Sequence, residues 1–410
     1  MTSPGSARSV HTLVIGAGQA GLCASYHLSR QGVEHVLLER ARIGERWRSE
    51  RWDSLRFQFP NRYVRLPGFP YDGDEPEAFM DRDGIVDVIE RYAEHIAAPV
   101  HCGTNVEHLD RDEDGRFVMS TSQGQFRAQN VIVATGPYQR TLVPAQAAAL
   151  PGRLRQLPAS AYTNANALPA GGVLVVGAGG SGVQITEDLL AAGRRTWLCV
   201  GNFKRIPRSY RGRDIMDWFE ALKLTEEPVT DRDPADHSPL LTGVDGGYEV
   251  DLRRVVAQGG TLLGRLEGVD GEALLLGDQL MAHMAAAERA YDDIVNGIEA
   301  AVAAGGDTSG SAPDRPPPPG PMPAAPPARL DLTAAGITSV IWATGYGVDF
   351  SWLRCGDFLA DGMPVQTRGV STVPGLYYLG LAFLHSARSS FFWGVGDDAE
   401  HVVSHLVQRN

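Results

Sequence analysis

The chain has 410 residues, which is too long for one hydrophobic core and predicts two domains or three. Its composition is 43% hydrophobic and 21% charged, and its formal net charge of -12 argues against nucleic acid as the main partner. No apolar run approaches the roughly 20 residues that span a bilayer, and the N-terminus leaves no room for a signal peptide. A cytoplasmic protein without membrane contact is therefore expected.

The cysteines stand far apart in the sequence, at Cys23, Cys102, Cys199 and Cys355. Their spacing is that of neither a C-x-x-C redox pair nor a metal site. The sequence therefore predicts a reducing compartment, no thiol chemistry and no bound metal.

The first predicted unit begins with a buried strand at Thr12–Ile15, a Gly-rich turn, a helix that ends at Gly32 and a second strand at Val36–Leu38. The turn fits G-x-G-x-x-G in the strand-to-helix setting that a dinucleotide pyrophosphate requires. Glu39 ends the second strand, where a carboxylate accepts hydrogen bonds from the ribose hydroxyls of an adenosine without a 2′-phosphate. These features predict an FAD site, with candidate residues Gly16, Gly18, Gln19, Ala20, Gly21, Glu39 and Arg40.

The stretch Arg42–Asp74 is too rich in aromatic residues and arginine for an idle linker. Arg46, Trp47 and Trp52 come where an extended FAD would present its ribityl and flavin parts. Gln58 and Asn61 can hydrogen-bond flavin edges, and Asn61 is also a catalytic candidate. The alternative is a surface loop stabilised by Trp–Arg contacts.

The next segment, Glu107–Gln129, alternates and carries Asp-Gly turns, which predicts a short antiparallel meander. A strand that ends in Ala-Thr-Gly follows at Val131–Tyr138. Val106, Thr135 and Gly136 are further candidates for the FAD site.

A second unit repeats the first, with a strand at Val173–Val176, a Gly-rich turn, a helix ending at Gly193, a strand at Thr196–Val200 and a later Ala-Thr-Gly. Val200 stands where the first unit has Glu39, so no carboxylate is available at this position to bind the ribose hydroxyls of a dinucleotide. Basic residues follow instead, and an arginine there suits a 2′-phosphate, although a solvated loop is the alternative. The prediction is an NADPH site, with candidates Gly177, Gly179, Gly180, Ser181, Gly182, Lys204, Arg205, Arg208, Ala343, Thr344 and Gly345, and with Arg211 and Arg213 in the same basic run.

Helical spacing over Asp278–Ala304 predicts one long packing helix. Residues 305–327 are rich in proline from Pro313 onward, which predicts an exposed, polyproline-like connection from the second domain back to the first. A Pro-rich recognition ligand is the alternative.

The C-terminal part, Leu376–Leu406, reads as a strand, a loop and a helix. The helix start offers Gly394, Gly396 and Asp397 to the flavin pyrimidine, where a helix N-terminus stabilises negative charge. His385 and Arg388, in the preceding loop, are catalytic candidates, although a lone histidine is more often structural.

The repeat predicts an α/β protein with two Rossmann-like dinucleotide-binding domains, the second inserted in the first. The expected division is residues 1–165 for the first part of the FAD domain, 166–335 for the NADPH domain, and 336–410 for the second part of the FAD domain.

In order along the chain, GAGQAG, RWRSERWDSL, RLPGFPY, VIVATGPY, VLVVGAGGSG, IPRSYRGRD, VIWATGY and FFWGVGDDA resemble the class B flavin-dependent monooxygenases. That family includes flavin-containing monooxygenases, N-hydroxylases, Baeyer–Villiger enzymes and a bacterial branch labelled putative potassium-transport flavoproteins. The resemblance implies a glutathione-reductase-like fold in which NADPH reduces FAD. Oxygen then forms a C4a-(hydro)peroxyflavin, which gives one oxygen atom to a small organic substrate.

One departure concerns Pro158, which replaces a histidine of the family pattern, while Tyr162 is kept. This puts Baeyer–Villiger chemistry in doubt and favours N- or S-oxygenation or hydroxylation. The alternatives are an NADPH-dependent flavoprotein reductase without a redox disulfide and a nucleotide-sensing regulator of cation transport. A homodimer is left open.

Overall fold

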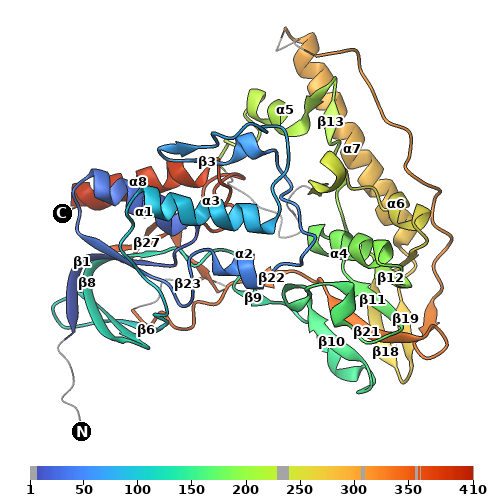
Figure 1. The fold of residues 1–410 in the computed structure, drawn as a ribbon, viewed down its shortest axis with the longest axis horizontal. Coiled ribbons are helices and arrows are strands. Elements are labelled where there is room, and N and C mark those ends of the chain that lie inside the picture. The colour runs from blue at the N-terminus through green and yellow to red at the C-terminus, as the bar shows by residue number, and fades with distance from the viewer. Residues whose placement is uncertain (1–6, 229–239, 306–309, 356–358, 361, 410) are drawn as a thin grey trace.

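The computed structural model describes residues 7–228, 240–305, 310–355, 359–360 and 362–409. Two sheets, each built around a core of parallel strands and covered by helices, lie side by side, one at the left and one at the right of Figure 1. This confirms the expected α/β architecture with two Rossmann-like units.

The first sheet has the parallel strand order β27-β8-β1-β2-β5. Helix α1 packs against α8 on this unit. The bounds of its main elements are β1 Arg8–Ile15, α1 Gln19–Arg30, β2 His35–Leu38, α3 Arg82–His95, β5 Val100–His101, β8 Gly124–Val133, β27 Leu376–Tyr378 and α8 Val395–Arg409.

The predicted meander is confirmed, because β6 (Val106–Arg111), β7 (Phe117–Thr121) and β8 pair in antiparallel order. Two further short strands, β25 (Gln366–Thr367) and β26 (Val370–Ser371), extend the other edge of the sheet beyond β27. Because β8 is shared, the meander and the nucleotide-binding strands form one continuous sheet.

The second sheet has the parallel order β10-β21-β11-β12-β17. Its elements are β10 Arg155–Pro158, β11 Gly172–Val176, α4 Gly180–Ala191, β12 Thr196–Cys199, β17 Thr261–Leu263 and β21 Ile337–Trp342. A small antiparallel sheet of β18 (Leu266–Asp270), β19 (Ala273–Leu276) and β20 (Arg329–Asp331) adjoins it in sequence.

The expected domain boundaries need revision, because β10 precedes residue 165 and β21 follows residue 336, yet both lie in the second sheet. The chain passes between the units at β9 (Arg140–Thr141) and β22 (Tyr346–Gly347), which pair with each other. Figure 1 shows this pair between the two sheets. We therefore propose that the inserted domain begins after β9 and ends before β22.

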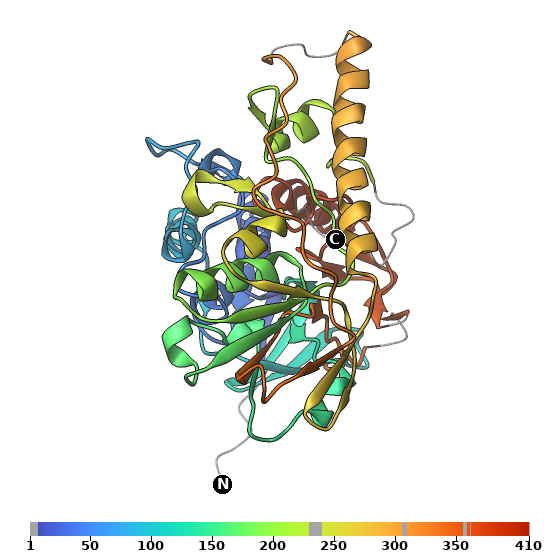
Figure 2. The ribbon, with the colours of Figure 1, turned by 90° about the vertical axis from the view of Figure 1, so that its right-hand side faces the viewer.

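The long helix is confirmed as α7, Leu280–Ala303. The segment after it carries no helix or strand over the described residues 310–328, and Figure 2 shows it running beside α7. It then enters β20, which pairs with β19 of the second unit. The expected return to the first domain is therefore wrong at this point, because the segment connects two elements of the same unit.

Shorter elements complete the described chain. They are α2 Glu45–Ser49, β3 Arg65–Leu66, β4 Phe69–Pro70, β13 Ser209–Tyr210, β14 Arg213–Asp214, α5 Ile215–Ala221, β15 Leu241–Thr242, β16 Tyr248–Glu249, α6 Arg253–Ala257, β23 Leu359–Ala360 and β24 Met363–Pro364.

The hydrophobic core continues from one unit to the other. Trp218 of α5 and Ile298 of α7 belong to the same buried cluster as Leu13 and Tyr63 of the first unit. The carboxylate of Asp217, also on α5, pairs with Arg62 at 2.7 Å. Helices α5 and α7, which follow the first strands of the second unit in the chain, thus pack against the first unit and help to stabilise it.

Two negative findings apply to the described part of the chain. None of its helices combines the length and apolar character needed to cross a membrane. Its His, Cys, Asp and Glu side chains form no group of three or more that could hold a metal ion.

Candidate functional site

The first Gly-rich turn has the geometry that close backbone packing demands. Gly16 has a φ of +106°, and a Cβ there would lie 2.6 Å from the carbonyl oxygen of Ala134. A Cβ on Gly21 would lie 1.9 Å from the oxygen of Gly16. By contrast, a Cβ on Gly18 would meet nothing within 4 Å, and Gly18 caps α1 without a side-chain hydrogen bond. The N–H groups at the start of α1 are therefore open to an anionic ligand.

The second turn repeats this geometry. Gly177 has a φ of +110°, and a Cβ there would lie 2.4 Å from the oxygen of Ala343. A Cβ on Gly182 would lie 1.8 Å from the oxygen of Gly177, whereas Gly179 and Gly180 face open space. In both units the alanine of Ala-Thr-Gly lies against the first glycine, which explains why the two motifs recur together in the sequence. Ser181 lies in the first turn of α4.

Glu39 lies beside the first turn, as expected. Its carboxylate accepts hydrogen bonds from the backbone N–H of Ala17 at 2.9 Å and of Ala41 at 3.0 Å. The side-chain amide of Gln19 donates to the carbonyl of Ser390 at 2.8 Å, which ties the turn to the C-terminal segment. Ala20 packs against Gly380, where a Cβ would lie 2.5 Å from the Ala20 Cβ.

The start of α8 is more crowded than a free helix terminus. A Cβ on Gly394 would lie 2.3 Å from the oxygen of Arg388, and one on Gly396 would lie 2.7 Å from Pro67. Asp397 accepts a hydrogen bond from Arg388 at 2.8 Å. Gly394, Gly396 and Asp397 thus lie close together as expected. The space beside the two glycines is filled by Arg388 and Pro67.

The two catalytic candidates of this loop already have protein partners. Arg388 also faces Glu226 at 3.7 Å. The backbone N–H of His385 donates to the hydroxyl of Ser389 at 3.0 Å, and its ring lies near the buried carboxylate of Asp398. Burial raises the pKa of Asp398, and its hydrogen bond with Ser389 and the nearby guanidinium of Arg368 oppose that rise.

Arg46 and Trp47 lie close to the first Ala-Thr-Gly. Arg46 pairs with Glu50 at 2.7 Å and donates to the carbonyl of Tyr138. Trp47 contacts the rings of Phe57 and Phe392, with centroids 6.1 and 6.5 Å apart. Trp47 therefore links its own segment to the C-terminal segment that carries Phe392.

Several other FAD candidates have local roles in the described structure. Arg40 pairs with Glu50 at 3.4 Å, and Val106 begins β6. The hydroxyl of Thr135 accepts a hydrogen bond from Gln139 at 2.8 Å, and Gly136 has a φ of +73°.

Trp52 and Asn61 are both buried and contact other parts of the protein. Trp52 is 4% exposed and packs in the hydrophobic cluster of the second unit, so the structure gives it a packing role. The side-chain amide of Asn61 donates to the carbonyl of Glu75 and accepts from the N–H of Met80, both at 2.9 Å, and so supports the backbone. At Gln58 the recorded contact is made by the backbone carbonyl, which accepts from Arg208 at 2.8 Å.

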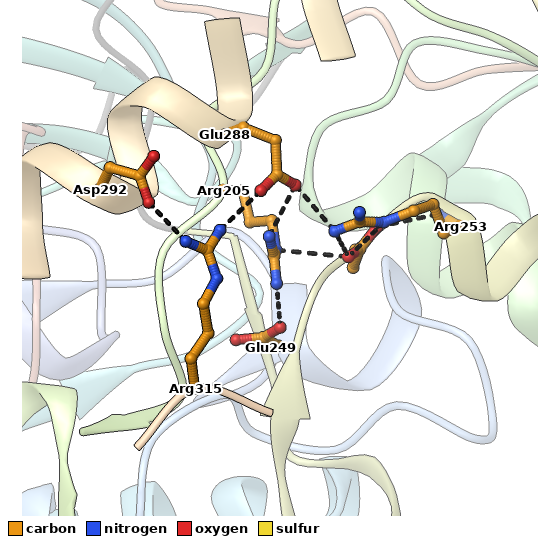
Figure 3. A network of polar contacts seen from close by, with 7 residues as sticks. Arg205, Glu249, Arg253, Glu288, Asp292 and Arg315 are labelled. Atoms are coloured by element: carbon orange, nitrogen blue, oxygen red, sulfur yellow. Dashed lines mark hydrogen bonds and ion pairs between the residues drawn. The ribbon is translucent and has the colours of Figure 1, made fainter. Parts of the chain in front are cut away.

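The proposed 2′-phosphate arginines are occupied by carboxylates. Arg205 is 2% exposed and pairs with Glu249 and Glu288 (Figure 3). Its guanidinium also lies over the Tyr291 ring at 4.4 Å. Arg208 is 8% exposed and pairs with Asp214. Their assignment to a 2′-phosphate is therefore not supported, because these charges are already neutralised by the protein. Lys204 is exposed, Arg211 pairs with Glu299 at 2.7 Å, and Arg213 lies over the Trp218 ring at 4.5 Å.

The same ionic network anchors the segment beside α7. In Figure 3, Arg315 from that segment reaches Glu288 at 2.7 Å and Asp292 at 2.6 Å. Glu288 also accepts from Arg253 at 2.7 Å. Burial raises the pKa of Glu249, and the hydrogen bond from Arg205 opposes that rise.

The second Ala-Thr-Gly lies at the crossing between the units. The hydroxyl of Thr344 donates to the carbonyl of Leu142, and the N–H of Leu142 donates to Gly345 at 3.0 Å. Pro158 is the last residue of β10 and lies opposite Trp342 of β21 in the second sheet. Tyr162 donates its hydroxyl to Asp188 of α4.

Sequence reasoning missed a cluster at this crossing. The Arg51 guanidinium lies over the rings of Trp47 at 5.4 Å and Tyr138 at 5.8 Å, and the rings of Tyr138 and Tyr346 are 5.2 Å apart. A signal was present, because each tyrosine follows one copy of the repeated Ala-Thr-Gly.

Two open helix N-termini, each formed by a Gly-rich turn that follows a parallel strand, are the geometry of two dinucleotide-binding sites. Residues 13–211 match the model of the pyridine nucleotide-disulphide oxidoreductase family. A curated relative, the uncharacterized CzcO-like oxidoreductase of Geobacillus kaustophilus (strain HTA426), is 30% identical over 408 residues, covering 98% of this chain and 99% of the relative.

Two solved structures share the fold. The flavin-containing monooxygenase from Stenotrophomonas maltophilia has a TM-score of 0.68 and 20% identity, covering 98% of this chain and 99% of that chain. OTEMO in complex with FAD and NADP has a TM-score of 0.55 and 17% identity, covering 99% and 86%. The chain belongs to the family of CzcO-like oxidoreductases, and it shares its fold with flavin-containing monooxygenases. It is an enzyme of the oxidoreductase class.

Proposed function

We propose that the enzyme is an NADPH-dependent monooxygenase that transfers one oxygen atom from O2 to a small organic substrate. N- or S-oxygenation or hydroxylation is favoured over Baeyer–Villiger chemistry, because Pro158 stands in place of the family histidine. The observation that carries the proposal is a pair of Gly-rich turns that match in geometry. They differ in the residue at the end of the following strand, where the ribose of a bound dinucleotide would lie. Glu39 lies beside the first, whereas the buried Val200 follows the strand that leads from the second.

The residues of this chain would bind and orient the cofactors. The N–H groups of α1 and α4 suit the two pyrophosphates, and Glu39 suits the ribose of FAD. Trp47, Phe57 and Phe392 form an aromatic wall that would exclude water from the reacting ring. Bound FAD would accept hydride from NADPH and, once reduced, react with oxygen.

The cysteines argue against a disulfide reductase. Thiol exchange requires a thiolate, but burial raises the pKa of Cys199 to about 12 and that of Cys355 to about 11. Burial also raises the pKa values of Cys23 and Cys102. All four cysteines are free, so electrons from the flavin have no disulfide within this chain to reduce.

The proposal is tested by mixing NADPH-reduced holoenzyme with oxygen in a stopped-flow spectrometer. We expect a long-lived absorbance that differs from both oxidised and reduced flavin, and that decays faster when a thioether or amine is present. With ¹⁸O2, the product should carry one labelled oxygen atom. Direct return to oxidised flavin, with stoichiometric hydrogen peroxide at every substrate concentration, would contradict the proposal.

A further inference from the structure

Arg51 differs from the other arginines of its segment. Every other arginine between residues 42 and 65 has a carboxylate partner in the described structure. The pairs are Arg42–Glu45, Arg46–Glu50, Arg48–Glu90, Arg56–Asp81, Arg62–Asp217 and Arg65–Glu220. Among the described residues, no carboxylate forms an ion pair with Arg51.

The contacts of Arg51 leave much of its hydrogen-bonding capacity unused. One Nη donates to the carbonyl of Glu50 at 2.7 Å, and the faces of Trp47 and Tyr138 flank the guanidinium. A guanidinium carries five N–H donors in a planar fork. Arg51 is only partly exposed, so its charge is partly removed from water without a protein counter-ion.

The place of Arg51 in the fold gives this observation its meaning. Tyr138 and Tyr346 follow the Ala-Thr-Gly of the first and the second unit, and their rings meet where β9 pairs with β22. The Tyr138 side chain is 40% exposed, so a ligand can reach this cluster from solvent. Ligands of doubly wound folds bind at these carboxyl ends of parallel strands.

We propose that Arg51 binds an oxyanion of a ligand that lies across the junction of the two units. A planar fork binds a phosphate or a carboxylate with two parallel hydrogen bonds, and a bound oxyanion would neutralise this unpaired charge. Two ligands could supply it, NADP(H) through a phosphate or the oxygen-accepting substrate through a carboxylate. Only the second source rests on the proposed monooxygenase function, because an NADPH-dependent reductase would bind NADP(H) as well.

The test compares holoenzyme variants Arg51→Gln and Arg51→Lys with the control Arg56→Gln, which removes an arginine of the same segment that pairs with Asp81 at 3.7 Å. The first probe is NADP+, titrated by calorimetry and by the change in flavin absorbance. The second is a matched pair of thioethers, methyl phenyl sulfide and 4-(methylthio)benzoate, which differ by one carboxylate. Flavin content and melting temperature report whether each variant folds.

For Arg51→Gln we expect Kd for the oxyanion ligand to rise about ten- to a hundredfold, the usual loss when a charged hydrogen bond is removed. Arg51→Lys should recover part of the affinity, and Arg56→Gln should match the wild type. A rise for NADP+ alone identifies the phosphate, and a rise for the benzoate but not the neutral sulfide identifies a substrate carboxylate. Unchanged affinity for all probes, or equal weakening of both sulfides without an effect on NADP+, would refute the proposal. Failure of oxygen transfer would leave the NADP+ result readable.

Discussion

Glu39 shows how one side chain can distinguish two nearly identical turns. Its two carboxylate oxygens accept hydrogen bonds from the backbone N–H groups of Ala17 and Ala41. These bonds hold the side chain where the ribose of FAD is expected. The second unit has the buried Val200 after the corresponding strand. The difference between the two sites lies at the ends of the strands, whereas the turns themselves are alike.

Replacing Glu39 with glutamine should weaken FAD binding. The amide keeps the size of the side chain but loses the charge that strengthens hydrogen bonds to the ribose, a loss of about 1.5–3 kcal/mol. The measurement is the Kd for FAD after removal of flavin, with the exposed Glu34→Gln as the control. If Glu39→Gln bound FAD as tightly as the control, the assigned role of Glu39 would be wrong.

The role of a single residue could be predicted from the sequence where it depends on neighbouring residues. It could not be predicted where the contacting residues lie far away in the chain. The requirement for glycine at positions 16 and 177 arises from a backbone conformation that the local motif already specifies. The ion pairs of Arg205 were not predicted, because its partners, Glu249 and Glu288, are distant in sequence. The packing of Trp52 was not predicted, because its neighbours belong to the other unit.

At the level of elements, α1 and α4 contact their strands so closely that an added methyl group has no room. A Cβ on Gly182 would approach the backbone oxygen of Gly177 to 1.8 Å, and backbone cannot move aside as a flexible side chain can. The start of α4 and the open N–H groups there depend on this contact.

Replacing Gly182 with alanine should therefore uncouple NADPH from the flavin while FAD is retained. Overpacking of this kind costs about 1–3 kcal/mol, and here the strain falls on the turn that we propose binds the pyrophosphate of NADPH. NADPH should reduce the variant's flavin much more slowly than the wild type, whereas dithionite should reduce both alike. Gly152→Ala is the matched control, since a Cβ there meets nothing within 4 Å. Wild-type reduction by NADPH would contradict this account of α4.

The order of helices and strands in each unit could be predicted from the sequence, because buried strands and Gly-rich turns have local signatures. The long helix α7 and the meander were predicted for the same reason. The path of the segment beside α7 was not predicted, because proline content predicts an extended chain but not its destination. Its course depends on contacts such as that of Arg315 with Glu288.

For the whole molecule, the two units are joined by contacts of residues 52–55 with the second unit. Asp188 of α4 accepts hydrogen bonds from the hydroxyls of Ser54 and Tyr162. The side chain of Asp53 accepts a hydrogen bond from Asn164 at 2.7 Å. These bonds place Trp52 in the core of the second unit.

Replacing Asp188 with asparagine should loosen this junction. The loss of charge from two hydrogen bonds should lower the free energy of unfolding by about 1.5–3 kcal/mol. Urea unfolding, followed by both flavin release and circular dichroism, measures the change. Asp245→Asn provides a control at an exposed ion pair with Arg254. An effect no larger than that of the control would show that Asp188 does not hold the units together.

The pairing of β9 with β22 also has a mechanical consequence. Both passages of the chain between the units run side by side as one two-stranded ribbon, with Thr141 opposite Tyr346. A rotation of one unit against the other must twist this ribbon and must also shear the contact between Tyr138 and Tyr346. The same ribbon places both joints of the inserted unit at one point in space, so that unit could be exchanged as a block by two cuts a few ångströms apart.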